Sequence, residues 1–272
     1  MRLLHRRRRR IGGDGVTAAM PTWNASQYLK FAEERTQPCR DLTARVPLAH
    51  PGSVIDLGCG PGNSTQVLAG RWPAARLAGL DNSAEMIAQA RASRPDWHWT
   101  TANIAEWAEG SERYDVVFSN AALQWLPDHR SLFPRLMDRV APGGALAVQM
   151  PGNGDAAAQV LMRNVAAQWT VTQDVRQWFT HDLGFYYDVL SAHAARVDLW
   201  ATEYIHIMDG AEDIVEWYKG TGLRPFLDAL PAAADRDRFL ANYLDAIREA
   251  YPPHDDGRVL LPFRRIFMVA ST

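Results

Sequence analysis

The sequence has few of the features that mark secreted, membrane-spanning or nucleic-acid-binding proteins. It contains two cysteines, Cys39 and Cys59, which are too few for a disulfide framework and predict a reducing, cytoplasmic location. No apolar run approaches the ~20 residues that a membrane span requires. The formal net charge of -2 provides no overall basic field. Neither nucleic acid nor a membrane is therefore an expected partner.

The first 19 residues differ from the rest of the chain. Residues 5–10 read HRRRRR, but no apolar run follows them, which excludes a secretory or twin-arginine signal. We expect residues 1–19 to be a disordered basic tail, or an extension upstream of a start at Met20. A basic arm that binds nucleic acid is the alternative.

The most informative stretch is VIDLGCGPG at residues 54–62. Its apolar residues suit a buried parallel strand, and its three glycines permit a tight turn with bare backbone. The spacing differs from the G-x-G-x-x-G of dinucleotide sites, because Asn63 stands where the third glycine belongs. Asp56 would repel a diphosphate but attract an ammonium or a sulfonium. The turn therefore predicts a ligand with a cationic end, against the alternative of a glycine-rich loop without a ligand.

Later strand ends carry further candidates. Asp81 lies about twenty residues after the glycines, where a doubly wound fold places the carboxylate that binds ribose hydroxyls. A solvated aspartate is the alternative. Met86, in the first turn of the next predicted helix, is placed to lie against an adenine face. Asn103 and Ile104 follow the third strand, where they are expected to contact the adenine amino group and ring.

The segment NAALQWLPDH at residues 120–129 follows the fourth predicted strand. Ligands bind beyond the carboxyl ends of such strands, so this segment is expected to border both cofactor and acceptor. Gln124 and Trp125 are the predicted site wall. His129 is a weak candidate for a general base, with a helix-start role as the alternative.

The strand and helix patterns predict a single α/β domain over residues 20–272, with a seven-stranded, Rossmann-like doubly wound sheet and helices on both faces. Its expected parts are an N-terminal helical lid, a cofactor-binding core, a helical segment and the last two strands, over residues 21–50, 51–152, 153–195 and 196–272. A helical insertion at 211–251 separates the last two strands. Because it is too long to lie against the sheet, it is expected to form a cap over the strand ends.

Several stretches together carry a family resemblance: WNASQYLKFAEER, DLGCGPGNST, RWPAAR, NAALQWLPDH, AVQMP, TGLRP and FRRIFMVA. From about Trp23 to Ala270 the chain resembles the trans-aconitate methyltransferases, a family of class I S-adenosylmethionine-dependent enzymes. The resemblance implies an antiparallel last strand and methyl transfer from S-adenosylmethionine to a carboxylate of trans-aconitate, giving a monomethyl ester and S-adenosylhomocysteine. It also implies a set of cofactor-binding residues: Asp56, Gly58, Cys59, Gly60, Asp81, Asn82, Met86, Asn103, Ile104, Asn120, Ala121 and Trp125. Family members usually carry aspartate where Asn103 stands.

If the acceptor is a carboxylate, its chemistry determines which side chains the substrate-binding part of the site needs. Its pKa near 4 leaves it ionised at pH 7, so neither a general base nor a metal is expected. Arginine forks and hydroxyl donors suit a small polycarboxylate. The candidates for this role are Tyr28, Arg35, Gln124, Tyr186, Tyr187, His206, Arg224, Arg264 and Arg265.

Two other functions remain open from the sequence. One is methyl transfer to another small-molecule acceptor, in which a neutral nucleophile would need a base such as His129. The other is a cofactor-binding protein without catalysis. The expected assembly is a monomer or a weak homodimer.

Overall fold

The computed structural model describes residues 32–172, 175 and 178–272. The predicted tail at residues 1–19 and the candidate Tyr28 lie outside the described residues, as does the side chain of Arg35. The first described helix is α2, Ala32–Arg45. It covers the later part of the predicted N-terminal lid segment.

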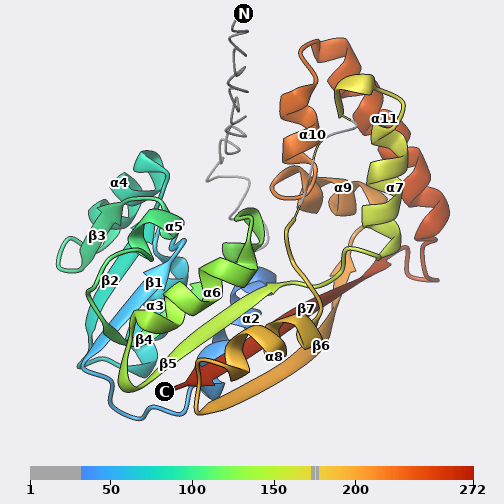
Figure 1. The fold of residues 1–272 in the computed structure, drawn as a ribbon. Helices are drawn as coiled ribbons and strands as arrows, with labels where there is room; N and C mark the ends of the chain where they lie inside the picture. The colour runs from blue at the N-terminus through green and yellow to red at the C-terminus, as the bar shows by residue number, and fades with distance from the viewer. Residues whose placement is uncertain (1–31, 173–174, 176–177) are drawn as a thin grey trace, which may run out of the picture.

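The described residues form a seven-stranded sheet in the order β3-β2-β1-β4-β5-β7-β6 (Figure 1). The strands are β1 Ser53–Leu57, β2 Arg76–Asp81, β3 His98–Thr101, β4 Tyr114–Asn120, β5 Val140–Pro151, β6 Arg196–Met208 and β7 Val259–Ser271. Strands β1 to β5 pair in parallel, whereas β7 runs antiparallel to both β5 and β6. The predicted fold, with its antiparallel last strand, is confirmed.

Helices cover both faces of the sheet and continue beyond one end of it. The helices after α2 are α3 Asn63–Arg71, α4 Ala84–Ser93, α5 Ile104–Trp107, α6 His129–Asp138, α7 Ala157–Ala166, α8 Leu183–Ser191, α9 Ala211–Lys219, α10 Arg224–Ala229 and α11 Ala233–Ala250. Leu42 of α2 and Leu68 of α3 share a core cluster with one face of the sheet. Phe133 of α6 and Tyr186 of α8 belong to the cluster on the other face. The central strand β4 is apolar and fully buried over residues 116–118, where it lies between the two helical layers.

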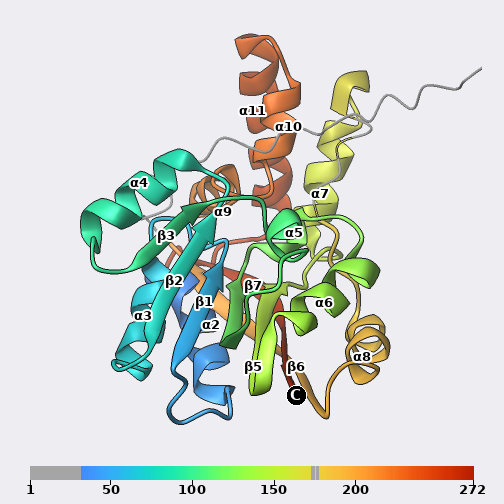
Figure 2. The same ribbon diagram turned by 60° about the vertical axis from the view of Figure 1, so that its left-hand side comes forward.

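The cap is formed by α7, α9, α10 and α11, which pack around their own apolar cluster. Figures 1 and 2 show these helices beyond the carboxyl ends of the parallel strands. β7 pairs with β5 only over residues 265–271, while β6 accompanies it back to Val259. The two strands therefore extend past the sheet, and Leu261 and Phe263 of β7 join the cap cluster. The predicted helical segment at 153–195 is divided, because α7 joins the cap and α8 packs against the sheet beside β6.

Among the residues that the structure describes, no helix combines the length and the apolar character needed to cross a membrane.

Candidate active site

The glycine turn brings bare backbone to the carboxyl end of β1. Gly58, Gly60 and Gly62 all have positive φ, at 73°, 54° and 95°. The N–H groups of Gly58 and Cys59 donate to the carbonyl of Leu80, at 2.7 and 3.0 Å, which fixes the turn against β2. A Cβ on Gly58 would lie 2.2 Å from the Cβ of Ala122, whereas one on Gly60 would meet no atom within 4 Å. The turn is thus packed on one side and open on the other, where a ligand can reach the backbone.

Asp56 is a fully buried carboxylate at the end of β1. Its Oδ2 accepts hydrogen bonds from the hydroxyls of Ser64, at 2.6 Å, and Thr65, at 2.7 Å. Its Oδ1 is buried without a hydrogen-bond partner among the described residues. Burial raises the pKa of Asp56 to about 6, against the smaller opposing effect of the two hydroxyls. A cation beside Oδ1 would satisfy this atom and favour the ionised form.

Asp81 holds the glycine turn to the end of β2. Its Oδ2 accepts from the N–H of Gly60 at 2.9 Å, and its Oδ1 accepts from the N–H of Ser83 at 2.9 Å. Burial raises the pKa of Asp81, and these backbone hydrogen bonds oppose the rise. Asn82 beside it is exposed, and Met86 is buried one turn into α4. The carboxylate therefore links the turn and α4 around the same opening.

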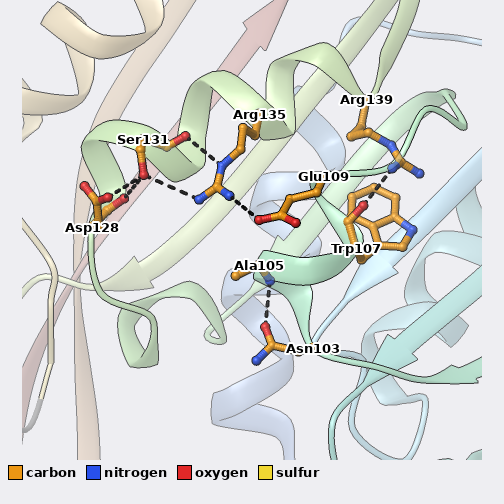
Figure 3. A network of polar contacts seen from close by, with 8 residues as sticks. All are labelled: Asn103, Ala105, Trp107, Glu109, Asp128, Ser131, Arg135 and Arg139. Atoms are coloured by element: carbon orange, nitrogen blue, oxygen red, sulfur yellow. Dashed lines mark hydrogen bonds and ion pairs between the residues drawn. The ribbon is translucent and has the colours of Figure 1, made fainter. Parts of the chain in front are cut away.

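Asn103 is the N-cap of α5. Its Oδ1 accepts from the N–H of Ala105 at 2.8 Å, as Figure 3 shows. The short helix is also tied to α6, because Arg135 forms an ion pair with Glu109 at 3.1 Å and Arg139 donates to the carbonyl of Trp107 at 2.7 Å (Figure 3). An asparagine serves this capping role as well as an aspartate would. The capping oxygen has a second lone pair for a ligand amino group.

A cavity lies between the carboxyl end of the sheet and the cap. It is lined by Asn120, Ala121, Gln124, Trp125, Pro151, Trp178, Trp217, Thr221, Phe263 and Arg265. Ala121 has φ of 55°, an uncommon conformation for a residue with a side chain, and its N–H donates to the carbonyl of Gln149 at 2.9 Å. Strained backbone of this kind is often found at binding and catalytic sites. Because Ala122 contacts the Gly58 position, the cavity and the glycine turn are neighbours.

The cavity has hydrogen-bond acceptors on the β4 side and donors elsewhere. Asn120 Oδ1 and Gln124 Oε1 are buried without hydrogen-bond partners in the described part of the chain. The Nε2 of Gln124 donates to the carbonyl of Ala121 at 2.7 Å, which leaves Oε1 for the cavity. Arg265 on β7 is buried, with its guanidinium 4.7 Å from the Phe263 ring and Nη1 3.5 Å from Oε1 of Gln149. Such an arrangement suits a ligand pair with a cation near β4 and an anion near β7.

Comparison with known proteins identifies the family. A family model described as a methyltransferase domain matches residues 31–224. A trans-aconitate 2-methyltransferase of Azoarcus sp. (strain BH72) is 49% identical over 253 residues, covering 92% of this chain and 99% of that protein. A protein of the same name from Methylobacterium nodulans is 50% identical over 256 residues, with 92% and 98% covered. The chain belongs to the trans-aconitate 2-methyltransferase family.

Solved structures agree with this family at the level of the fold. The YcgJ protein of Bacillus subtilis superimposes with a TM-score of 0.57 at 11% identity, covering 87% of this chain and 98% of that one. Phosphoethanolamine N-methyltransferase 2 of Haemonchus contortus, solved with S-adenosylhomocysteine, gives a TM-score of 0.53 at 16% identity, with 86% and 52% covered. The shared architecture is that of a methyltransferase.

The predicted substrate-binding residues differ in their position relative to the cavity. Gln124 and Arg265 line the cavity. His206 is buried just behind it, with its ring centroid 4.6 Å from that of Trp217. Arg264 is exposed on the opposite face of β7, where its Nη1 donates to the carbonyl of Gly152 at 3.3 Å. Adjacent strand residues point to opposite faces, so Arg264 and Arg265 cannot both reach the cavity.

Three other candidates do not line the cavity. Tyr186 is buried in the layer of α6 and α8, and Tyr187 on the same helix is 55% exposed. Arg224, at the start of α10, forms an ion pair with Asp228 at 3.0 Å. The expectation that these three residues surround the acceptor is not supported by their positions, because α8 packs against the sheet and α10 turns Arg224 toward its own helix.

The cavity lining includes residues that are not among the predicted site residues: Trp178, Trp217, Thr221 and Phe263. They come from the segment before α8, from α9, from the turn after it and from β7. Trp178 lies within residues 153–195, which the sequence predicts only as a helical segment. No local pattern distinguishes these residues from core residues of the cap.

His129 lies in a buried, hydrogen-bonded environment and is not among the residues that line the cavity. It is fully buried, with Nδ1 2.7 Å from the hydroxyl of Tyr186 and Nε2 2.9 Å from the carbonyl of Leu123. Burial lowers its pKa. Both ring nitrogens are therefore engaged within the protein, away from the residues that line the cavity.

Replacement His129→Ala should accordingly affect stability and not chemistry. It leaves the Tyr186 hydroxyl without this partner and opens a cavity under α6, so we expect a loss of roughly 2–4 kcal/mol in the free energy of unfolding. Denaturant unfolding measures this loss. The kcat of the folded variant at a permissive temperature should stay within a few-fold of wild type; a fall of a thousandfold would instead mark His129 as a catalyst.

Proposed function

We propose that this chain transfers the methyl group of S-adenosylmethionine to one carboxylate of trans-aconitate, releasing the monomethyl ester and S-adenosylhomocysteine. The proposal rests on one observation: two side chains of opposite charge lie at the same edge of the sheet. Asp56 offers a buried carboxylate with a free oxygen, and Arg265 brings a buried cation to the adjoining cavity. The names of the relatives, at about half identity over nearly their whole length, support the same acceptor.

The residues around the glycine turn fit the cofactor. Bare backbone on the open side of the turn, at Gly60, would admit its amino acid end, and the free oxygen of Asp56 would attract its ammonium group. Asp81 is assigned to the ribose hydroxyls, and Met86 with Ile104 to the adenine ring. Asn120 and Gln124 line the cavity, and their side-chain oxygens, which have no hydrogen-bond partner among the described residues, would stabilise a sulfonium there.

The reaction needs alignment more than acid–base chemistry. The bound cofactor supplies an electrophilic methyl group. The acceptor carboxylate is already ionised at neutral pH, so the protein has to hold its oxygen in line with the methyl carbon and the sulfur. Positioning of this kind can contribute roughly 7–11 kcal/mol. The indole rings of Trp125, Trp178 and Trp217 contribute an apolar wall to the cavity, and an apolar environment favours a step that neutralises one cation and one anion.

Methylation assays test the proposal. Labelled S-adenosylmethionine is supplied with trans-aconitate, other di- and tricarboxylates, phenols and amines, and the product is identified by mass spectrometry. We expect a monomethyl ester of trans-aconitate, with kcat/KM nearly constant above pH 7 because no base must lose a proton. Methylation of an amine or a phenol, with no ester from any carboxylic acid, would overturn the proposal.

Cofactor affinity should fall in acid through Asp56. With a pKa of about 6 in the ligand-free protein, the carboxyl is mostly ionised at pH 7 and mostly protonated at pH 5. A cationic ligand favours the ionised form, so binding must release the proton at low pH. We expect the Kd of S-adenosylmethionine to rise about tenfold between pH 7 and pH 5. Calorimetry measures it, and Asp56→Asn should bind more weakly at pH 7 with a flat profile; an unchanged slope in this variant would contradict the assignment.

A further inference from the structure

Trp178 lines the cavity and carries a buried hydrogen-bond donor. Its Nε1 is inaccessible to solvent and has no hydrogen-bond partner within the described ranges. Two other buried tryptophans use the same atom as a donor: Trp72 donates to the carbonyl of Leu48 at 3.0 Å, and Trp99 to that of Arg94 at 2.7 Å. A buried donor without an acceptor destabilises the folded protein, because it has lost its hydrogen bonds to water. Since the indole lines a cavity, the missing acceptor is expected to be part of a ligand.

The backbone fixes where this indole lies. The N–H of Phe179 donates to the carbonyl of Gln124 at 2.8 Å, so the segment that carries Trp178 is held against the wall that follows β4. Arg265 lines the same cavity from β7. Two donor side chains thus reach one enclosed space from segments far apart in the sequence.

The chemistry of the donors selects the group that they bind. An indole N–H donates and cannot accept, and a guanidinium only donates, so both require an acceptor. A carboxylate suits both, because it has two oxygens and a charge that complements Arg265. The acceptor oxygens of Asn120 and Gln124 would repel it, which orients the anion away from β4.

We infer that Trp178 is a specificity-determining residue, whose indole N–H binds, together with Arg265, a carboxylate of the acceptor other than the one that is methylated. This inference rests on the proposed function. It makes a second carboxylate a requirement for good acceptors, and it distinguishes trans-aconitate from a monocarboxylic alkenoic acid.

The variant Trp178→Phe tests the inference, because it keeps an aromatic ring and removes the donor. The measurement is kcat/KM for trans-aconitate divided by kcat/KM for crotonate, a monocarboxylic alkenoate. We expect this ratio to fall roughly 10- to 150-fold in the variant, through a higher KM for trans-aconitate, as the loss of one hydrogen bond to a charged group predicts. Should the phenylalanine variant not fold, Trp178→Met repeats the test without a donor.

Trp169→Phe is the matched control. Trp169 also lies in the cap, but its Nε1 donates to Asp235 at 3.2 Å and it does not line the cavity. We expect this control to melt at a lower temperature and to keep the wild-type ratio. If Trp178→Phe keeps the wild-type ratio while the wild-type enzyme is active on trans-aconitate, the role of Trp178 is overturned and the proposed function stands. Absence of any wild-type turnover of polycarboxylates overturns the proposed function, and this inference with it.

Discussion

Arg265→Gln should raise the KM for trans-aconitate roughly 30- to 4,000-fold and leave the Kd of S-adenosylhomocysteine within about twofold of wild type. Arg265 brings a buried positive charge into the cavity. Removing one partner of a buried, hydrogen-bonded charge pair costs about 2–5 kcal/mol, because the other charge remains desolvated. Glutamine keeps part of the side chain and a donor, so the loss reports the charge and the guanidinium fork. Steady-state kinetics and calorimetry give the two constants.

The neighbouring arginine supplies the control. Arg264 precedes it on β7 and is exposed on the other face, where its Nη1 donates to the carbonyl of Gly152. Arg264→Gln makes the same chemical change outside the cavity, and we expect KM within about threefold of wild type, as for most surface substitutions. Equal losses in the two variants would show that overall charge, and not the cavity, attracts the acceptor.

Asp81→Ala should raise the Kd of S-adenosylmethionine by about 100-fold or more, with a smaller effect on any acceptor constant measured at saturating cofactor. Two effects add. The carboxylate assigned to the ribose hydroxyls is lost, and the N–H groups of Gly60 and Ser83 lose the acceptor that holds the turn. Hydrogen bonds to a charged group contribute about 1.5–3 kcal/mol each. Calorimetric titration with cofactor measures the change.

Asp115→Ala separates the binding role from the structural one. The Oδ2 of Asp115 accepts from the N–H groups of Gly52, at 2.7 Å, and Ser53, at 2.9 Å. It therefore holds a turn to the sheet as Asp81 does, but at the start of β1 and β4, the edge opposite the site. We expect a comparable loss of melting temperature in the two variants and an unchanged cofactor Kd in Asp115→Ala. Weakened binding in both would reduce the role of Asp81 to general stability.

Local patterns in the sequence were enough to predict the glycine turn and the two acids beside it. Residues 54–62 combine a strand, an acid and a turn within nine positions, and Asp81 ends the next strand. Parallel neighbouring strands bring their carboxyl ends to one edge, so sequence order alone places these side chains together. The contact between Asp81 and Gly60 follows directly from that topology.

The acceptor side depended on contacts that no local pattern records. Whether Arg264 or Arg265 faces the cavity follows from the pairing of β7 with β5 and β6, and Tyr186 is directed away by the packing of α8. Trp178 reaches the cavity through a hydrogen bond between Phe179 and Gln124, more than fifty residues apart. The sequence by itself determined the strands, the turn and the sign of charge at each end of the site. Only the tertiary structure decided which arginine and which tryptophan lie there, because side-chain direction across distant segments is set by packing and strand register.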